Sequence, residues 1–161
     1  MPVIYLALGS NVGDSNKYID ETMGLLKSKL TDIQEAPRYR SKAWGYTEQT
    51  DFVNTAIRAN TDLKPHALLV FVKATEDEVG RIKRFRWGPR EIDIDIIFYE
   101  NRVVSEPNLH IPHARFKERD FVLKPLNDLS PQMVDPISKK TIATLLSELP
   151  PSELSVISVI D

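Results

Sequence analysis

A chain of 161 residues is long enough for one domain with its own core, and with 42% apolar and 27% charged residues it has a globular composition. Lysine and arginine total 21 against 23 aspartates and glutamates, and this net charge of −2 excludes a uniformly basic protein that coats nucleic acid. The absence of cysteine excludes disulfides, thiolate catalysis and cysteine-bound metals, which fits a reducing, cytoplasmic location.

The chain opens with a pattern typical of a buried strand followed by a helix. Val3 to Leu8 are continuously apolar, and the turn residues after them place a helix N-cap at Asp14 or Ser15. Apolar residues then recur at the helical period and form one stripe. That stripe consists of Ile19, Met23, Leu26 and Leu30.

A second strand, a long loop and a third strand are expected next. Ile33 to Arg40 has strand character, and Pro37 within it favours an edge or a bulge. Ser41 to Asp51 shows no periodicity and is predicted as a loop. Phe52 to Ala59 alternates well enough for a strand.

A second helix and a fourth strand complete the first hundred residues. Pro65 suits the first turn of a helix. Arg81 to Arg90 is predicted as a loop, and Ile92 to Tyr99 is a strand rich in β-branched residues. One face of this helix is predicted to carry Leu68, Val72, Glu76 and Val79.

The order strand, helix, strand, strand, helix, strand predicts an α+β fold of the ferredoxin-like βαββαβ type, with an antiparallel sheet and helices on one face. Residues 100–161 are rich in proline and contain short helical stretches near 115–129 and 141–149. We expect this C-terminal extension to wrap the sheet, so that residues 1–161 form a single domain.

No segment is typical of a membrane span or a signal peptide. The longest apolar runs, Val3 to Leu8 and Ala67 to Val72, are far shorter than the ~20 residues that cross a bilayer. No basic segment precedes the first of them. We therefore expect no membrane partner.

The sharpest chemical feature is a pair of aspartates on the fourth strand. Asp93 and Asp95 are two residues apart, so both side chains should leave the same face, about 6–7 Å apart along the strand. Two carboxylates at that spacing can hold Mg²⁺, which also takes phosphate oxygens as ligands. An exposed polar sheet face is the alternative. Repulsion between the two charges favours a site that receives positive charge.

A cationic loop precedes these carboxylates and contains no acidic residue. Arginine binds phosphate oxygens through two parallel hydrogen bonds, so a metal–nucleotide site is favoured over a solvated loop. No phosphate-binding loop motif is present, and Gly9 to Gly13 lacks the dinucleotide spacing and is better explained as a tight turn. The cations are Arg81, Lys83, Arg84, Arg86 and Arg90.

Aromatic and amide side chains offer a place for a flat heterocycle. Phe52 and Asn54 share one strand face, where a ring and a carboxamide can stack on and bond to a planar ligand. A core role for Phe52 and for Phe121 is the alternative. His113 precedes a cluster of basic residues and is a candidate for a bond to phosphate or nucleobase.

Five segments together resemble the 6-hydroxymethyl-7,8-dihydropterin pyrophosphokinase family over nearly the whole chain. The most specific is the Trp-Gly-Pro-Arg run that is followed by the two aspartates. The segments are Leu8-Gly9-Ser10-Asn11, Phe52-Val53-Asn54, Arg86 to Arg90 with Ile92 to Ile97, Ile111-Pro112-His113, and Arg119 to Leu123.

The resemblance implies transfer of a diphosphate from ATP to the pterin hydroxymethyl group, with release of AMP. It implies that Asp93 and Asp95 bind two Mg²⁺ ions, and that Asp95, Arg81 and Arg90 are catalytic. The implied pterin site consists of Ser41, Lys42, Ala43, Trp44, Gly45, Phe52, Asn54 and Phe121. The implied nucleotide site consists of Lys73, Glu76, Arg81, Arg84, Trp87, Arg90, Ile96, His113 and Arg119.

Two functions of other classes are weighed against this enzyme. A ferredoxin-like RNA-binding module would use the basic loop, but carboxylates on the sheet face repel phosphate. A metal-dependent phosphohydrolase would release phosphate without a pterin. We expect a monomer whose partners are ATP and the pterin, not nucleic acid.

Overall fold

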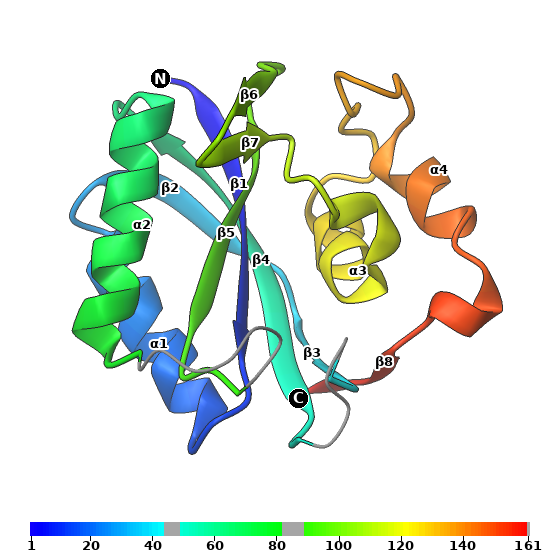
Figure 1. Ribbon diagram of the computed structural model, residues 1–161, viewed down its shortest axis with the longest axis horizontal. Helices are drawn as coiled ribbons and strands as arrows, with labels where there is room; N and C mark the ends of the chain where they lie inside the picture. Colours follow the sequence, from blue (N-terminus) through cyan, green and yellow to red (C-terminus); the bar gives the residue numbers. More distant parts are fainter. Residues whose placement is uncertain (44–48, 82–88, 161) are drawn as a thin grey trace.

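The computed structural model describes residues 1–43, 49–81 and 89–160 (Figure 1). The predicted βαββαβ order is present in its first hundred residues, followed by a C-terminal extension. The strands are β1 (Val3–Ser10), β2 (Leu30–Glu35), β3 (Arg38–Ser41), β4 (Phe52–Thr61), β5 (Asp93–Tyr99), β6 (Val104–Glu106), β7 (Leu109–Ile111) and β8 (Val156–Ile160). The helices are α1 (Ser15–Leu26), α2 (Pro65–Val79), α3 (Asp120–Leu129) and α4 (Ile142–Ser147), with short 3₁₀ turns at Phe116–Glu118 and Pro151–Glu153.

The main sheet is antiparallel, in the order β5-β1-β4-β3-β8, and β2 also pairs with β4. The central strands β1 and β4 are long and buried, and Val3 pairs with Asn60 at one end while Ser10 pairs with Val53 at the other. This order is the ferredoxin-like arrangement that the sequence predicts, with β8 added at one edge.

The expected second strand is two strands, which corrects the prediction of one strand over residues 33–40. Pro37 has no N–H to donate, and the strand divides beside it. Ala36 still donates to the carbonyl of Ala56 at 2.9 Å, so both pieces follow β4. The helical stripe was also extended too far, because α1 ends at Leu26 and Leu30 begins β2.

Helix boundaries otherwise follow local signals. The Asp14 side chain accepts a hydrogen bond from the backbone N–H of Lys17 and caps α1, as predicted. Pro65 occupies the first turn of α2. That helix ends at Gly80, whose φ of 110° lies in the left-handed region that glycine tolerates.

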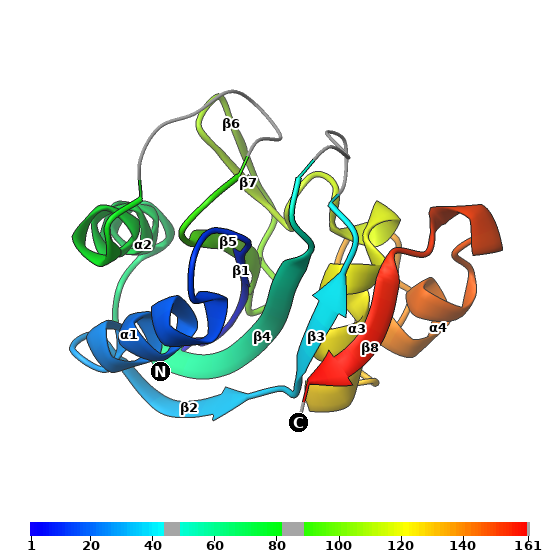
Figure 2. The same ribbon diagram turned by 90° about the horizontal axis from the view of Figure 1, so that it is seen from below.

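Helices cover both faces of the sheet. Helices α1 and α2 lie on one face and α3 and α4 on the other (Figure 2). Each face has its own buried apolar cluster, one around Ile4, Leu6 and Ile94 and one around Tyr5, Phe98 and Leu123. The C-terminal extension therefore wraps the sheet face that the βαββαβ unit leaves open.

Two features of the extension were not predicted. β6 and β7 form a separate antiparallel pair. The chain then returns to the main sheet, where β8 pairs with β3 and Tyr39 lies opposite Val159. None of the helices in the described part of the chain is long and apolar enough to cross a membrane.

Candidate active site

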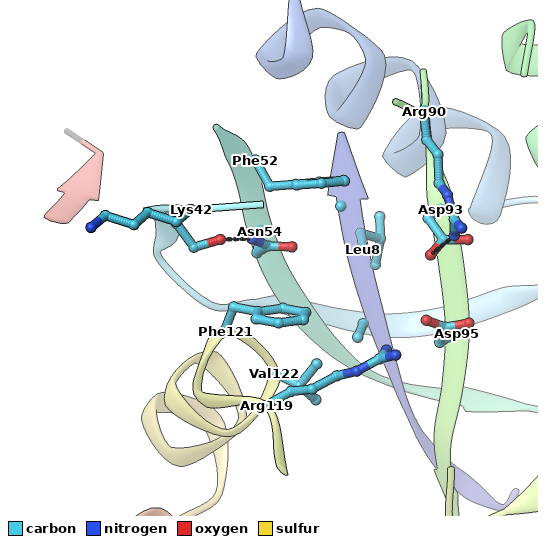
Figure 3. A pocket seen from close by; sticks show the side chains of 13 residues that line it. Leu8, Lys42, Phe52, Asn54, Arg90, Asp93, Asp95, Arg119, Phe121 and Val122 are labelled. Carbon is cyan, nitrogen blue, oxygen red and sulfur yellow. Dashed lines mark hydrogen bonds and ion pairs between the residues drawn. The ribbon is translucent and has the colours of Figure 1, made fainter. Parts of the chain in front are cut away.

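A pocket opens between the sheet and the start of α3, at the end of the sheet where β1 finishes and β5 begins (Figure 3). Strands β1, β3, β4 and β5 contribute one wall and the residues around the start of α3 the other. Its lining consists of Ala7, Leu8, Gly9, Ser41, Lys42, Phe52, Asn54, Arg90, Asp93, Asp95, Arg119, Phe121 and Val122. Seven of the residues that the resemblance implies for the pterin and the metal therefore meet in one cavity: Ser41, Lys42, Phe52, Asn54, Phe121, Asp93 and Asp95.

One end of the pocket is aromatic. Phe52 comes from β4 and Phe121 from α3, and Figure 3 shows Asn54 between the two side chains. The amide nitrogen Nδ2 of Asn54 donates to Oγ of Ser41 at 2.6 Å. Because Ser41 and Asn54 are both buried, this bond fixes the orientation of the amide, with Oδ1 as its remaining acceptor.

Gly9 forms part of the floor beneath that amide. A Cβ added at Gly9 would lie 2.8 Å from Oδ1 of Asn54 and 3.6 Å from the ring of Phe52. The first distance is shorter than a side chain tolerates. Glycine at this position therefore allows β1 to approach the polar and aromatic groups of β4 closely.

The other end is acidic. Asp93 and Asp95 project from the same face of β5, as the alternation predicted, and lie opposite Gly9 and Ala7 of β1. Arg90 donates to Oδ2 of Asp93 at 2.9 Å, and Arg81 is 3.8 Å from Oδ1. Asp93 is thus held between two cations.

Asp95 has fewer stabilising partners than Asp93. Within the described ranges its carboxylate accepts no hydrogen bond, and Nε2 of His113 lies 3.9 Å from its Oδ1. Burial, and next the negative charge of Asp93, raise the pKa of Asp95 to about 7. The ionised form of this carboxylate is therefore disfavoured.

Glu76 supports this end from behind. Its carboxylate is 1% exposed and accepts hydrogen bonds from the backbone N–H of Ile94 at 2.7 Å and from Arg81 at 3.1 Å. Lys73 lies 3.4 Å from it. Burial raises the pKa of Glu76, and the adjacent cations and the Ile94 N–H oppose the rise. Glu76 thereby ties α2 to β5 and orients Arg81.

His113 and Arg119 complete the acidic end. Nδ1 of His113 accepts from the backbone N–H of Arg115 at 3.2 Å, which leaves Nε2 on the side of Asp95. Burial, and next the charge of Arg119, lower the pKa of His113 to about 4, so the ring is neutral at pH 7. Burial lowers the pKa of Arg119, and the two aspartates oppose this. Its guanidinium carbon lies 5.7 Å from the ring centroid of Phe121.

The remaining predicted site residues are placed as follows. Lys42 lines the pocket, Ala43 is buried beside it, and Lys73 is on α2 with 46% of its side chain exposed. Ile96 is buried in the core beneath α1 and α2, on the opposite face from Asp95. The predicted site residues Trp44, Gly45, Arg84 and Trp87 lie outside the described residues.

Asn11 is a buried residue that the sequence analysis placed in a turn and in a segment resembling the family, without giving it a role. Its Oδ1 accepts from the backbone N–H of Arg90 at 2.8 Å, and its own N–H donates to the carbonyl of Arg90 at 3.0 Å. Its Nδ2 donates to Gln49 and to the carbonyl of Thr50. Asn11 therefore fixes the backbone at Arg90, and an amide directly after a buried strand was the only signal of this role.

The donor chemistry of the acidic end suits a hard divalent cation. Carboxylate oxygens are what Mg²⁺ prefers, and a bound cation would favour the ionised form of Asp95. No group of three or more His, Asp and Glu side chains that could hold a metal forms among the residues described. Asp93 and Asp95 would therefore hold the ion together with substrate oxygens and water, the way Mg²⁺ is commonly bound.

Comparisons with known proteins agree on one family. The family model described as 7,8-dihydro-6-hydroxymethylpterin-pyrophosphokinase (HPPK) matches residues 5–131. The 2-amino-4-hydroxy-6-hydroxymethyldihydropteridine pyrophosphokinase of Aquifex aeolicus is 43% identical over 142 residues, which cover 88% of this chain and 89% of that protein. The folic acid synthesis protein FOL1 of Dictyostelium discoideum is 41% identical over 92% of this chain but only 22% of its own length.

The fold is also found in solved structures. A crystal structure of a triple mutant of Plasmodium falciparum HPPK-DHPS superposes with a TM-score of 0.74 at 16% identity. The match covers 91% of this chain and 43% of that one, so the chain spans less than half of the Plasmodium protein. At this identity the likeness shows the fold alone.

Proposed function

The chain belongs to the 7,8-dihydro-6-hydroxymethylpterin-pyrophosphokinase family, and from this we propose that it transfers the diphosphate of ATP to the hydroxymethyl group of 6-hydroxymethyl-7,8-dihydropterin and releases AMP. As a pterin pyrophosphokinase it takes ATP as co-substrate and serves folate biosynthesis. The observation that carries the proposal is the single pocket that joins an aromatic slot to paired carboxylates and arginines.

The aromatic end fits the flat pterin. Phe52 and Phe121 would lie against its two faces, where stacking between rings is favourable. One of the two N–H groups of Asn54 Nδ2 donates to Ser41, and Oδ1 would accept from the N–H groups on the pyrimidine edge of the pterin. Ser41 thus fixes the orientation in which the amide of Asn54 meets the substrate.

The acidic end fits the polyphosphate once a cation is bound. Asp93 and Asp95 would hold Mg²⁺, two ions in our proposal, which when bound neutralise phosphate charge and polarise the phosphoryl oxygens. Arg90 is held in place by Asp93 and by the Asn11 clamp on its backbone. Together with Arg81 and Arg119, it would bind phosphate oxygens and oppose their negative charge during transfer.

Transfer then requires positioning and one proton acceptor. The pterin hydroxyl oxygen attacks the β-phosphorus in line, the bond from that phosphorus to the oxygen bridging to the α-phosphate breaks, and AMP leaves. Asp95 lies at the acidic end of the same pocket, and its carboxylate would receive the hydroxyl proton. The neutral His113 would donate from Nε2 to a phosphate oxygen.

Both halves of the chain are needed for this pocket, because Arg119, Phe121 and Val122 come from the C-terminal extension and the other lining residues from the sheet and its loops. We therefore propose that residues 1–161 act as one domain. We also propose a monomeric enzyme, whose pocket in the described ranges would need no residue from a second copy.

Product analysis tests the proposed function. The purified chain is incubated with ATP and MgCl₂, with and without 6-hydroxymethyl-7,8-dihydropterin, and nucleotides are separated by chromatography. We expect AMP to form only with the pterin, and only with Mg²⁺ present. Phosphate released without pterin would instead indicate a phosphohydrolase. Binding of single-stranded RNA at physiological salt without turnover would indicate an RNA-binding module.

A further inference from the structure

We propose, on the basis of the proposed function, that Asp120 is a positioning residue for the pterin. Its carboxylate holds the start of β8 against β3 and so sets the place of Phe121 on one side of the pterin slot and of Ser41 and Lys42 at its edge. Asp120 does not line the pocket and would not touch the substrate.

The contacts of Asp120 are directed entirely at the start of β8 among the residues described. The side chain belongs to a residue that is 3% exposed. Oδ2 accepts from the backbone N–H of Ser155 at 2.7 Å and of Val156 at 2.8 Å. Oδ1 accepts from Oγ of Ser155 at 2.6 Å. Hydrogen bonds to a charged acceptor are about twice as strong as neutral ones, so this clamp is firm.

The clamp continues into the pocket wall through the backbone. The carbonyl of Ser155 accepts from the N–H of Lys42 at 2.9 Å, and Val156 pairs with Ser41 in the sheet. Ser41 in turn accepts the bond that orients Asn54. Three consecutive contacts therefore connect Asp120 to the amide that would select the pterin edge.

The same residue also anchors the other side of the slot. Asp120 is the first residue of α3, between the two pocket-lining residues Arg119 and Phe121. With its carboxylate fixed on β8, the first turn of α3 cannot rotate freely about its axis. The ring of Phe121 is thereby held at a set distance from β3 and β4, on which Ser41 and Phe52 lie.

Apart from the bonds to Asp120, few contacts hold β8 to the rest of the described structure. Its side chains Ile157 and Val159 are 43% and 51% exposed, and within the described sheet β8 is an edge strand that pairs only with β3. An acidic residue in the first turn of a helix also favours the helix dipole. A favourable interaction with the helix dipole does not require the carboxylate to be buried or to bond to another element. The three hydrogen bonds from Ser155 and Val156 are instead what a residue that fixes β8 needs.

The test measures pterin affinity separately from ATP affinity. The variants are Asp120→Asn, which keeps the shape and removes the charge, and Ser155→Ala, which removes only the hydroxyl bond. The control is Asp135→Asn, since Asp135 is 0% exposed and accepts two backbone N–H bonds, from Ile137 and Ser138, away from the pocket. Calorimetry with 6-hydroxymethylpterin and, separately, the KM for ATP are recorded for the full chain.

We expect the pterin Kd to rise about tenfold in Asp120→Asn and about threefold in Ser155→Ala, the size of one charge-assisted and one weaker hydrogen bond. The KM for ATP should stay within about twofold of the wild-type value. Asp135→Asn should bind pterin like the wild type even if its Tm falls as far as that of Asp120→Asn. A folded Asp120→Asn variant with wild-type pterin affinity would overturn the inference. So would equal losses for pterin and ATP. A wild-type chain that binds no pterin would instead refute the proposed function itself.

Discussion

At the aromatic end of the pocket the polar groups bond to one another, whereas at the acidic end like charges face one another. Asn54, Ser41 and the backbone around Lys42 form a connected set of hydrogen bonds that needs no ligand. Asp95 instead has its pKa raised to about 7 by burial and by Asp93. The aromatic end therefore has its hydrogen-bonded arrangement before the substrate binds. At the acidic end, the ionised form of Asp95 stays unfavourable until positive charge arrives with the nucleotide.

Replacing Asp95 should produce the largest difference between an effect on turnover and an effect on pterin binding. We expect Asp95→Ala to lower kcat for AMP formation about a thousandfold or more, because both a metal-binding carboxylate and the proton acceptor are lost. Pterin affinity should change by less than about threefold, because the aromatic end does not depend on this side chain. Steady-state kinetics and calorimetry with 6-hydroxymethylpterin measure the two effects.

An exposed aspartate on α2 provides the control for that variant. Asp77 contributes only its backbone carbonyl to the contacts described, and its side chain is exposed. Asp77→Ala should therefore retain full turnover. Near-normal turnover in Asp95→Ala would contradict the assignment of the acidic end as the reaction centre.

Phe121→Ala should have the opposite effect, a loss of pterin affinity with little change in the KM for ATP. The ring covers one side of the slot, and loss of a stacking contact of this kind should raise the pterin Kd about 10- to 100-fold. The KM for ATP should be much less affected. Phe121→Tyr keeps the ring and serves as the control. Equal losses of pterin and ATP affinity would show that the two ends are not independent.

A substitution at Gly9 tests the role of β1, the strand that runs between the aromatic and acidic ends of the pocket. Gly9→Ala places a Cβ at 2.8 Å from Oδ1 of Asn54, so the amide must move or β1 must shift against β4. We expect an increase of about tenfold in the pterin Kd, the cost of one displaced hydrogen bond. Gly24 is a control within α1, because a Cβ there meets nothing within 4 Å. Gly24→Ala should leave affinity unchanged and stabilise the helix by about 0.5–1 kcal/mol.

Much of the fold was predictable because its signals are local. The cap at Asp14, the first-turn proline of α2 and the shared face of Asp93 and Asp95 each depend on neighbours within a few positions. The division beside Pro37 was signalled by that proline, although the two resulting strands were predicted as one. Leu30 fitted a helical stripe equally well, since periodicity alone cannot tell where a helix ends.

The parts that were not predicted depend on contacts between distant segments. β8 joins the sheet through a strand more than a hundred residues earlier, and Asp120 binds residues 35 and 36 positions later. No pattern of hydrophobicity encodes such partners. The meeting of Phe52 with Phe121 in one pocket was anticipated only by resemblance to a family, and the structure places both rings there.

The smallest expected effect is on stability, and its sign follows from the pKa of Asp95. The folded-state pKa of about 7 lies above the usual 3.8, so on raising the pH the unfolded chain releases this proton first. Asp95 therefore costs the apo protein stability progressively from about pH 4 to pH 7. Asp95→Asn lacks this titration, so its stability relative to wild type should increase as the pH rises from about 4 to 7 and should be lowest below about pH 4. Urea unfolding of both metal-free chains across this range measures the difference, and an Asn variant whose stability relative to wild type does not increase across it would show that the acidic end is not electrostatically strained.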